Sequence, residues 1–410
     1  HYPTQAFIGK DLISFEREFT DFYPIPFVNI SNQYYTVLES GIFFFPDIHF
    51  NIKKSFFNNV VKNIVAGKPL DTVPIKSFII YDSLKRRVYL VRDMIGRTPL
   101  YYCNVDGRLM FGSSIRDFSE YSEMHTKNIY KFIIKGYFPK NETILDGVKK
   151  VPHGSIATFK SDNHNLCSYW KSSAFLSDIS SINNNFNLLE SVIRDMASDH
   201  SHVGVLSSGG LGSSVIIKTL SSMGSLYAFH ILLEDDNKSY LEGEASSKEI
   251  CNYLGVNHNT LSVNRKSFIR SFEKIVPLMQ EPVYEIDLPC IYSALNNIKR
   301  IKVIFSGWGA NDIISSRDSY INNLSDNLCF HDIVFSSMSK SLMLPYLDYR
   351  LIELSELLYR RYSLRIRDVL SECSGAYIPK LLNRKSKGTG IPHEWKKEIT
   401  DIYKLYNGRS

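Results

Sequence analysis

Residues 202–223 read HVGVLSSGGLGSSVIIKTLSSM. The apolar stretch His202–Leu206 has the composition of a buried strand, and Ser213–Met223 has that of a helix. Gly209 and Gly210 lie between them, where the absence of a Cβ lets the backbone turn sharply and approach a ligand. This part of the chain therefore predicts a strand, a glycine-rich turn and a helix.

The expected turn suits a phosphate group. The N-terminus of the following helix offers unpaired N–H groups and a partial positive charge, and Ser208, Ser213 and Ser214 add hydroxyl donors. Together these groups predict an anion site of the kind that binds pyrophosphate. The turn is neither a Walker loop nor a GxGxxG motif. A plain glycine- and serine-rich connection between a strand and a helix stays open as an alternative.

The sequence around this turn alternates between helix and strand. We expect, in order, helix Asn187–His200, strand Leu226–Leu232, helix Glu244–Leu254 and strand Ile301–Phe305, which ends in a second glycine-rich turn at 306–309. This order predicts a parallel sheet covered by helices, with both turns at the carboxyl ends of strands, where ligands bind. Residues 317–339 show little periodicity.

The first part of the chain reads as β-rich, and Asp106-Gly107 predicts a hairpin turn. A Ser- and Asn-rich stretch separates it from the part described above. We therefore expect an α/β protein of two domains: a β-rich domain at 1–175, a linker at 176–187 and a parallel-sheet domain at 188–410. The expected N-terminal strands are Gln33–Leu38, Gly41–Phe45, Lys76–Tyr81, Arg87–Val91, Leu100–Cys103 and Leu109–Gly112.

Composition excludes several classes of protein. The 410 residues are 44% hydrophobic and 22% charged, which excludes disorder as the main state. The net charge of +6 forms no dense run, so we expect no nucleic-acid partner. The 6 cysteines are scattered, which argues against a disulfide framework or a zinc site. Apolar runs are shorter than the ~20 residues of a membrane span, and no signal peptide begins at His1, so we expect a cytoplasmic protein.

Eight segments, in order along the chain, resemble the asparagine synthetase B family. The first glycine-rich turn is similar to the family's SGGxDSS pyrophosphate loop, and the segment at 92–102 is similar to a strand pair of its N-terminal glutaminase-like domain. Each match is weak alone, but the ordered set is specific. The segments are RDMIGRTPLYY (92–102), FGSSI (111–115), VKKVPHG (148–154), SGGLGSS (208–214), EP (281–282), FSGWG (305–309), LPYLDYR (344–350) and GTGIP (388–392).

The resemblance implies a glutaminase-like sandwich domain followed by an ATP-pyrophosphatase domain. It implies an ATP-dependent ligase in which a carboxylate attacks the α-phosphate, giving an acyl-adenylate and pyrophosphate, and an amine then displaces AMP. Mg²⁺ would bridge the phosphates. The residues that it places at the nucleotide are Leu206, Ser208, Gly209, Gly210, Leu211, Gly212, Ser213, Ser214, His230, Gly307, Trp308 and Gly309.

The resemblance also implies further site residues, each with a plainer alternative. Lys385 or Lys387 matches a lysine that stabilises the intermediate, although both also suit a solvated basic face. Glu281, Glu285 and Asp287 resemble a substrate-side acidic segment, although exposed loop carboxylates would look the same. His230 could lend groups to adenine or be structural, and Trp308 could stack on a ligand or cover the strand end.

The chain departs from the family pattern at its nucleophile and at its metal ligands. The family's glutaminase nucleophile is a cysteine directly after the initiator Met, whereas this sequence starts at His1 and Cys103 falls in an expected hairpin. We therefore expect no glutamine hydrolysis, as in the β-lactam synthetases and lasso-peptide cyclases. Gly212 and Asn311 stand where relatives carry the two aspartates that hold Mg²⁺. Asp312 could replace them by a register shift, or could cap a helix.

Two functional hypotheses follow. The first is a ligase that resembles a lasso-peptide cyclase and closes a ring in a precursor peptide, with a leader-binding or protease partner; amidation of a small carboxylate fits nearly as well. The second is a pseudo-ligase that binds a nucleotide, a peptide or a partner protein because its metal acids are lost. The sequence alone does not separate an inactive natural or engineered variant from an active enzyme.

Overall fold

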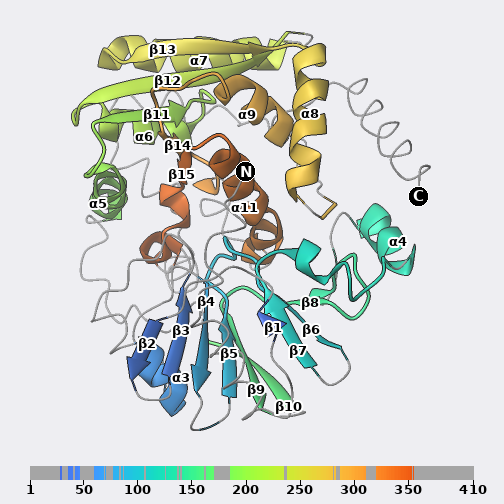
Figure 1. Ribbon diagram of the computed structural model, residues 1–410. Helices are drawn as coiled ribbons and strands as arrows, with labels where there is room; N and C mark the ends of the chain where they lie inside the picture. The colour runs from blue at the N-terminus through green and yellow to red at the C-terminus, as the bar shows by residue number, and fades with distance from the viewer. Residues whose placement is uncertain are drawn as a thin grey trace. The chain divides into compact units, whose positions relative to one another are not determined.

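The computed structural model (Figure 1) falls into two compact units. The first contains residues 1–175, 280–284 and 321–329, and the second contains 176–279, 285–320 and 330–410. The structure describes residues 28–29, 36–39, 42–46, 60–68, 70, 77–82, 85, 87–105, 108–124, 126–135, 138, 141–160, 163–169, 185–234, 238–279, 281–282, 287–310, 320–352 and 354.

The first unit contains two β-sheets. The larger is a six-stranded antiparallel sheet with the order β10-β9-β5-β4-β3-β2. The smaller has the order β1-β7-β6-β8. The strands are β1 (Val28–Asn29), β2 (Thr36–Glu39), β3 (Ile42–Pro46), β4 (Phe78–Asp82), β5 (Arg87–Val91), β6 (Tyr101–Val105), β7 (Arg108–Gly112), β8 (Lys149–Lys150), β9 (Ser155–Lys160) and β10 (Asn163–Ser168).

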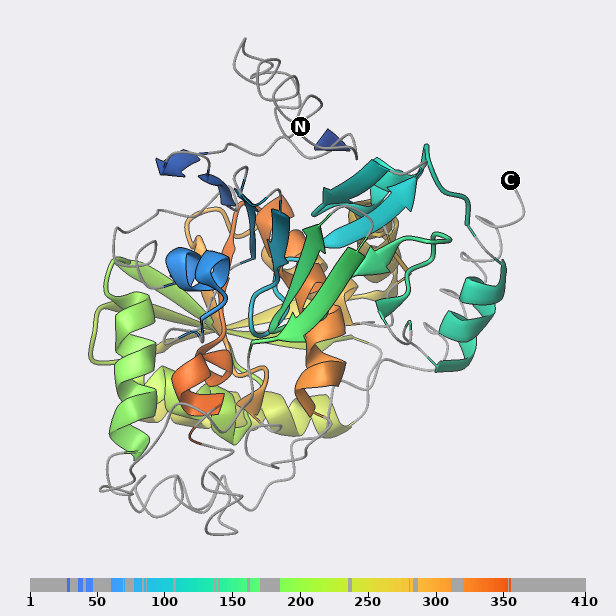
Figure 2. The same ribbon diagram turned by 90° about the horizontal axis from the view of Figure 1, so that it is seen from below.

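The two sheets share one core, as expected of a sandwich. Side chains alternate between the faces of a strand, so Ile79 of β4 and Leu90 of β5 pack with Phe111 of β7. Phe78 of β4 and Val91 of β5 point the other way, toward helix α3 (Lys62–Ala66). Figure 2 shows α3 and the β6–β7 pair on opposite sides of β4 and β5. The unit also contains α4 (Thr126–Lys135) and a short 3₁₀ turn, η2 (Ile115–Phe118).

The second unit is built on a five-stranded parallel sheet with the order β13-β12-β11-β14-β15. Its strands are β11 (His202–Leu206), β12 (Ser225–Leu233), β13 (Asn257–Val263), β14 (Val303–Ser306) and β15 (Ser341–Met343). Its helices are α5 (Asn185–Ala197), α6 (Leu211–Leu220), α7 (Lys238–Leu254), α8 (Arg265–Met279) and α9 (Asp287–Leu295), with a 3₁₀ turn, η5 (Pro345–Leu347). A further helix, α11 (Tyr320–Ser337), has residues in both units.

Helices cover both faces of the parallel sheet. Leu233 of β12 and Val263 of β13 pack with Phe268 of α8 and Cys290 of α9. His230, which points to the opposite face of β12, lies against Gly243 of α7. The three central strands β11, β12 and β14 are therefore mostly buried, which explains their largely apolar composition, whereas the edge strand β13 is more polar and more exposed.

The coarse fold prediction is confirmed: the chain is α/β, with a β-rich N-terminal part and a parallel sheet in the C-terminal part. Strand β11 has the predicted bounds, and β6 and β7 pair with Val105 opposite Arg108, as the Asp106-Gly107 hairpin requires. Helix α5 begins at Asn185, inside the stretch expected to be a linker. The stretch 317–339, which showed little periodicity, contains the 18-residue helix α11. Among the described residues, no helix is both long and apolar enough to span a membrane.

Candidate functional site

The predicted phosphate loop is the turn between β11 and α6. Ser207 donates its N–H to the Phe229 carbonyl and ends the strand pairing. Gly209 then takes a left-handed conformation with φ of +74°, and a Cβ there would lie 2.3 Å from the carbonyl oxygen of Gly243. Since only glycine tolerates both conditions, Gly209 sets the path by which the chain enters α6 at Leu211. The N–H groups of the first turn of α6 are then available to an anion.

The serine hydroxyls are arranged differently from the prediction. Ser213 and Ser214 both donate through Oγ to the carbonyl of Gly210, at 3.1 and 2.9 Å. These two side chains are buried and stabilise the first turn of α6. Ser208 is exposed, and its Oγ accepts a hydrogen bond from the N–H of Gly210 at 3.3 Å. The contact of the three serine hydroxyls with a phosphate stays a prediction.

The second glycine-rich turn lies against the first. Strands β11 and β14 are parallel neighbours, with Leu206 opposite Ser306, so both turns follow the carboxyl ends of adjacent strands. A Cβ on Gly307 would lie 2.8 Å from the backbone nitrogen of Ser213. Tyr346 of η5 donates its hydroxyl to the Gly212 carbonyl at 3.1 Å. The structure therefore brings the predicted residues of the two turns together, backbone against backbone.

Trp308, in the second turn, packs against a buried histidine. Its ring centroid lies 4.5 Å from that of His331 in α11. Burial lowers the pKa of His331 to about 4, opposed by the charge of Asp332, so this imidazole is neutral at physiological pH. Trp308 is itself half-buried. The stacking partner found for it is thus a side chain of the protein, which leaves its predicted contact with a ligand as a prediction.

His230 lies beneath the phosphate loop. Its ring is 4% exposed, and its Nδ1 lies 2.7 Å from the carbonyl oxygen of Ser207. Two further residues that the sequence did not single out continue the network: Ser247 donates to Ser207 Oγ at 2.5 Å and lies 2.9 Å from Nε2 of His258. The pKa of His258 is lowered, first by burial and then by His230 and Lys248, and the charge of Glu244 opposes this shift. Ser207, the residue before the loop, is therefore held through both its carbonyl and its hydroxyl.

The described residues fit the pyrophosphate of a nucleotide but not a magnesium ion. Phosphate groups bind to the free N–H groups of a helix N-terminus and to a glycine-rich backbone, which a ligand can approach closely. Gly212 has no side chain to coordinate a metal, and a Cβ there would lie 2.6 Å from the Cβ of Ala310. Within the described ranges, no three His, Cys, Asp or Glu side chains form a group that could hold a metal ion. Asn311 and Asp312 lie outside the described residues.

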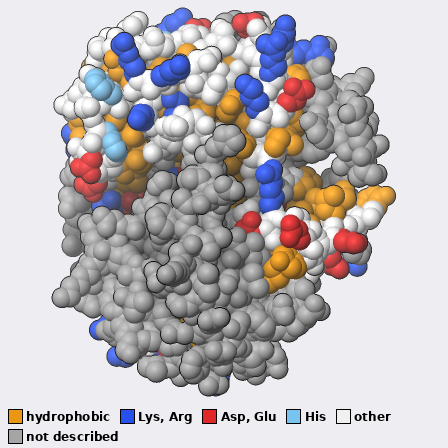
Figure 3. All heavy atoms as spheres, in the orientation of Figure 1, with side chains coloured by type: hydrophobic (Ala, Val, Ile, Leu, Met, Phe, Trp, Pro, Cys, Tyr) orange, Lys and Arg blue, Asp and Glu red, His pale blue; other side chains and the backbone are white. Residues whose placement is uncertain are grey.

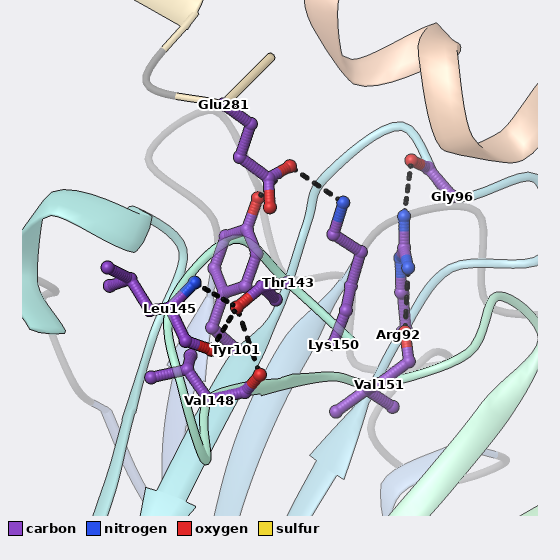
Figure 4. A network of polar contacts seen from close by, with 9 residues as sticks. All are labelled: Arg92, Gly96, Tyr101, Thr143, Leu145, Val148, Lys150, Val151 and Glu281. Atoms are coloured by element: carbon purple, nitrogen blue, oxygen red, sulfur yellow. Dashed lines mark hydrogen bonds and ion pairs between the residues drawn. The ribbon is translucent and has the colours of Figure 1, made fainter. Parts of the chain in front are cut away.

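Glu281 is buried in the first unit, so it is not an exposed loop carboxylate. Its side chain is 2% exposed, and its Oε2 accepts hydrogen bonds from Lys150 Nζ at 2.8 Å and from the Tyr101 hydroxyl at 3.1 Å (Figure 4). We refer to Tyr101, Lys150 and Glu281 as the Glu281 cluster. This cluster could not be predicted from the sequence, because partners 131 and 180 residues apart leave no local pattern.

The remaining predicted site residues are only partly described. Asp287 is the first residue of α9, where a carboxylate is favoured by the helix dipole. Glu285, Lys385 and Lys387 lie outside the described residues. On the face shown in Figure 3, the Lys and Arg side chains of the described residues are scattered among other side chains. The expectation that the chain has no nucleic-acid partner stays a prediction.

Two protein families match this chain. The family described as "Asparagine synthase" matches residues 187–396, and the family described as "Glutamine amidotransferase domain" matches residues 74–170. The former covers just over half of the 410 residues.

Curated relatives agree with these matches. A putative glutamine-hydrolysing asparagine synthetase of Mycobacterium tuberculosis H37Rv is 24% identical over 266 residues, which are 61% of this chain and 40% of that protein. The microcin J25-processing protein McjC of Escherichia coli is 26% identical over 179 residues, which are 41% of this chain and 33% of that protein. The chain thus spans about two fifths of the length of the asparagine synthetases that it matches.

Solved structures give a more distant likeness. The glutamine-dependent NAD⁺ synthetase of Acinetobacter baumannii, solved with ADP, is 14% identical, with a TM-score of 0.25. The likeness covers 58% of this chain and 51% of that one.

Proposed function

This chain belongs to the asparagine synthase family, and from that premise we propose that it is an ATP-dependent, AMP-forming amide ligase that closes a macrolactam ring in a precursor peptide. One observation carries the proposal: two glycine-rich turns at the carboxyl ends of the adjacent parallel strands β11 and β14 meet at Ser213 and Gly307. Such a junction, at the N-terminus of α6, suits a bound pyrophosphate.

In the proposed reaction, a carboxylate oxygen of the peptide attacks the α-phosphorus of ATP, and pyrophosphate leaves. The peptide's amine then attacks the acyl carbon, losing a proton as AMP leaves, so that an amide bond forms. The first turn of α6 would bind the phosphates through backbone N–H groups. No step is assigned to a metal ion, because Gly212 does not fit one.

A peptide substrate is favoured by the relative described as a microcin J25-processing protein. We propose that residues 1–175 form a scaffold domain, that 188–410 form the ligase domain, and that the amine comes from the peptide itself rather than from glutamine. Cys103 supports this last point, because it is buried in β6 and burial raises the pKa of its thiol to about 11. Lys385 or Lys387 would stabilise the intermediate, and Glu285 and Asp287 would lie on the substrate side.

The test is to incubate the chain with ATP and a synthetic peptide that has a free N-terminal amine and internal aspartate and glutamate residues. We expect AMP and pyrophosphate in equal amounts, and a peptide lighter by one water. Formation of ADP, or hydrolysis of ATP without loss of water from the peptide, would contradict the proposed reaction.

A second candidate function is favoured by a separate observation. Ala310 occupies the space that a side chain at position 212 would need. A protein with this packing could bind a nucleotide, a peptide or a partner protein without turnover. Calorimetric titration with ATP, with and without Mg²⁺, separates the two candidates: binding that is indifferent to Mg²⁺, with no AMP formed, favours the pseudo-ligase.

A further inference from the structure

We propose that Tyr346 is a positioning residue for the first turn of α6: its hydroxyl holds the peptide group between Gly212 and Ser213, so that the N–H of Ser213 points at a bound pyrophosphate. The inference rests on the proposed function for the anion itself. The contact of Tyr346 with α6 does not, since its hydroxyl donates to the Gly212 carbonyl at 3.1 Å. All three residues belong to the second unit.

The peptide group between Gly212 and Ser213 has its N–H on the anion side of α6. A trans peptide group is planar, and its C=O and N–H point in opposite directions. A hydrogen bond that fixes the carbonyl of Gly212 therefore also fixes the direction of the Ser213 N–H. Ser214 is the residue whose N–H makes the first bond of the helix, to the Gly210 carbonyl at 3.1 Å. The Ser213 N–H thus belongs to the groups that a helix leaves to other acceptors.

The second glycine-rich turn lies against the same peptide group. A Cβ on Gly307 would lie 2.8 Å from the nitrogen of Ser213 and 3.0 Å from the carbonyl carbon of Gly212. Only a glycine admits this approach without a shift of the backbone. The peptide group is thus contacted at its oxygen by Tyr346, while the backbone of Gly307 lies against its carbon and nitrogen. These two contacts leave it little freedom to rotate.

The 3₁₀ turn η5 places Tyr346 beside the two glycine-rich turns. Strand β15 is the parallel neighbour of β14, with Met343 opposite Phe305, so η5 follows the carboxyl end of the next strand in the sheet. Leu347 of η5 lies against the second turn, because a Cβ on Gly309 would be 2.6 Å from its Cδ2. Adjacent residues of η5 therefore contact both parts of the site: Tyr346 contacts the start of α6, and Leu347 contacts the second turn.

Tyr346 is itself held firmly. Its side chain is 1% exposed, and burial raises the pKa of its hydroxyl, so this group keeps its proton and remains a donor. At the end of η5, Arg350 donates to the two carboxylate oxygens of Asp348 at 2.8 and 3.1 Å, and to Asp195 of α5 at 3.1 Å. Such bracing is what a positioning residue needs, because a loose side chain would lose its geometry to rotamer entropy.

The test is calorimetric titration of the full chain with sodium pyrophosphate. Tyr346→Phe keeps the ring and removes only the hydroxyl, so we expect the affinity for pyrophosphate to fall about two- to tenfold, the range of one hydrogen bond. The matched control is Tyr169→Phe in the first unit, which removes a tyrosine hydroxyl from the Arg92 carbonyl at 2.7 Å and should leave the affinity unchanged. An unchanged affinity in Tyr346→Phe, an equal loss in both variants, or no binding to the unmodified chain would each overturn the proposal.

A second measurement separates positioning from a general loss of stability. Labelling glycine with ¹³C at its carbonyl and serine with ¹⁵N selects the Gly–Ser peptide groups, at 112–113, 154–155, 212–213 and 224–225. Ser213→Ala removes one NMR signal and so identifies it. A hydrogen bond to a carbonyl polarises its peptide group, so Tyr346→Phe should move the Ser213 signal upfield in ¹⁵N and leave the others in place. An unmoved Ser213 signal, or movement of all the signals, would overturn the positioning role.

The unmodified chain covers the outcome in which Tyr346→Phe does not fold. Bound pyrophosphate should move the Ser213 signal, because its N–H then donates to the anion, and a signal that does not respond would overturn the proposal. None of these measurements needs turnover. If pyrophosphate binding depends on Tyr346 but the chain releases no AMP with the synthetic peptide, the proposed ligase function fails and the role of Tyr346 stands. If AMP is released but Tyr346→Phe binds pyrophosphate unchanged, the role of Tyr346 fails alone.

Discussion

Gly212 and Ala310 pack so closely that no side chain fits between them: a Cβ on Gly212 would lie 2.6 Å from the Cβ of Ala310. The aspartate that relatives are expected to carry at position 212 is therefore not merely missing. Its place is filled by the second glycine-rich turn, whose residue Ala310 is 3% exposed. An aspartate at position 212 therefore requires space for its side chain, which Ala310 now fills.

We predict that Gly212→Ala destabilises the protein by about 1–3 kcal/mol, because overpacking forces the two turns apart. Ala310→Gly in the same chain should recover most of that loss by removing the opposing methyl group. Urea unfolding of both variants and of Ala310→Gly alone provides the comparison. If the single and double variants are equally unstable, the contact between these residues is not the cause.

The same reasoning governs any attempt to rebuild the metal site. Gly212→Asp with Asn311→Asp should gain Mg²⁺-dependent ATP binding only when Ala310→Gly is included. Calorimetric titration with ATP and Mg²⁺ measures the gain. Equal gain with and without Ala310→Gly would contradict this expectation.

We predict that Gly209→Ala destabilises the protein by about 2 kcal/mol or more, because a left-handed backbone and a 2.3 Å approach to the Gly243 carbonyl act together. Gly67→Ala is the matched control, since Gly67 has a similar φ of +67° but nothing lies within 4 Å of its added Cβ. Gly67→Ala should lower the free energy of unfolding only by the cost of placing alanine in a left-handed conformation, about 1–2 kcal/mol. Equal losses in urea unfolding would show that the close approach contributes nothing.

Ser247→Ala should destabilise the protein by about 1–3 kcal/mol, because it leaves Ser207 Oγ and His258 Nε2 without the partner they share. It should also weaken ATP binding, since Ser207 directly precedes the phosphate loop. Ser191→Ala on α5 is the control, because among the described residues that hydroxyl bonds to the Leu188 carbonyl of its own helix. ATP titration and urea unfolding together separate an effect on the loop from a general loss of stability.

The pH dependence of stability should carry a contribution from His331. Its pKa is lowered from 6.5 to about 4 in the folded protein, so the unfolded chain binds a proton more readily between these values. The contribution is fully present above about pH 6.5 and is lost as the pH falls toward 4, with a size of about 3 kcal/mol.

His331→Phe should therefore flatten the unfolding free energy between about pH 6.5 and pH 4 while keeping a ring against Trp308. The control is His200→Asn, at an exposed histidine after α5. Urea unfolding at several pH values gives the slopes. An unchanged slope in His331→Phe would mean that burial of this imidazole does not control the acid sensitivity.

Local pattern predicted the part of the fold that carries the site. The apolar run of β11 and the glycines that follow it determine a strand, a turn and a helix within a few residues of each other. The β-branched and aromatic run at Lys76–Tyr81 likewise predicted a strand, which the structure has as β4, Phe78–Asp82. In each case, the physical cause lies in neighbouring residues.

Other features depend on distant parts of the chain and could not be predicted in this way. In α11, residues 328–331 are all buried, so this turn of the helix is covered on every side and shows no apolar stripe. The partners of Glu281 lie in β6 and β8, 180 and 131 residues away in the sequence. A residue pattern records which side chains are polar, but not which distant group they meet.

The pairing of Lys150 with Glu281 also limits how this protein can be recombined. The lysine lies in the segment matched by the amidotransferase family and the glutamate in the segment matched by the asparagine synthase family. A chimera that takes one segment from a relative with an uncharged residue at either position would bury a lone charge, at a cost of about 3–5 kcal/mol. The two segments can therefore be exchanged only as a matched set, and substitutions at these two positions should be inherited together.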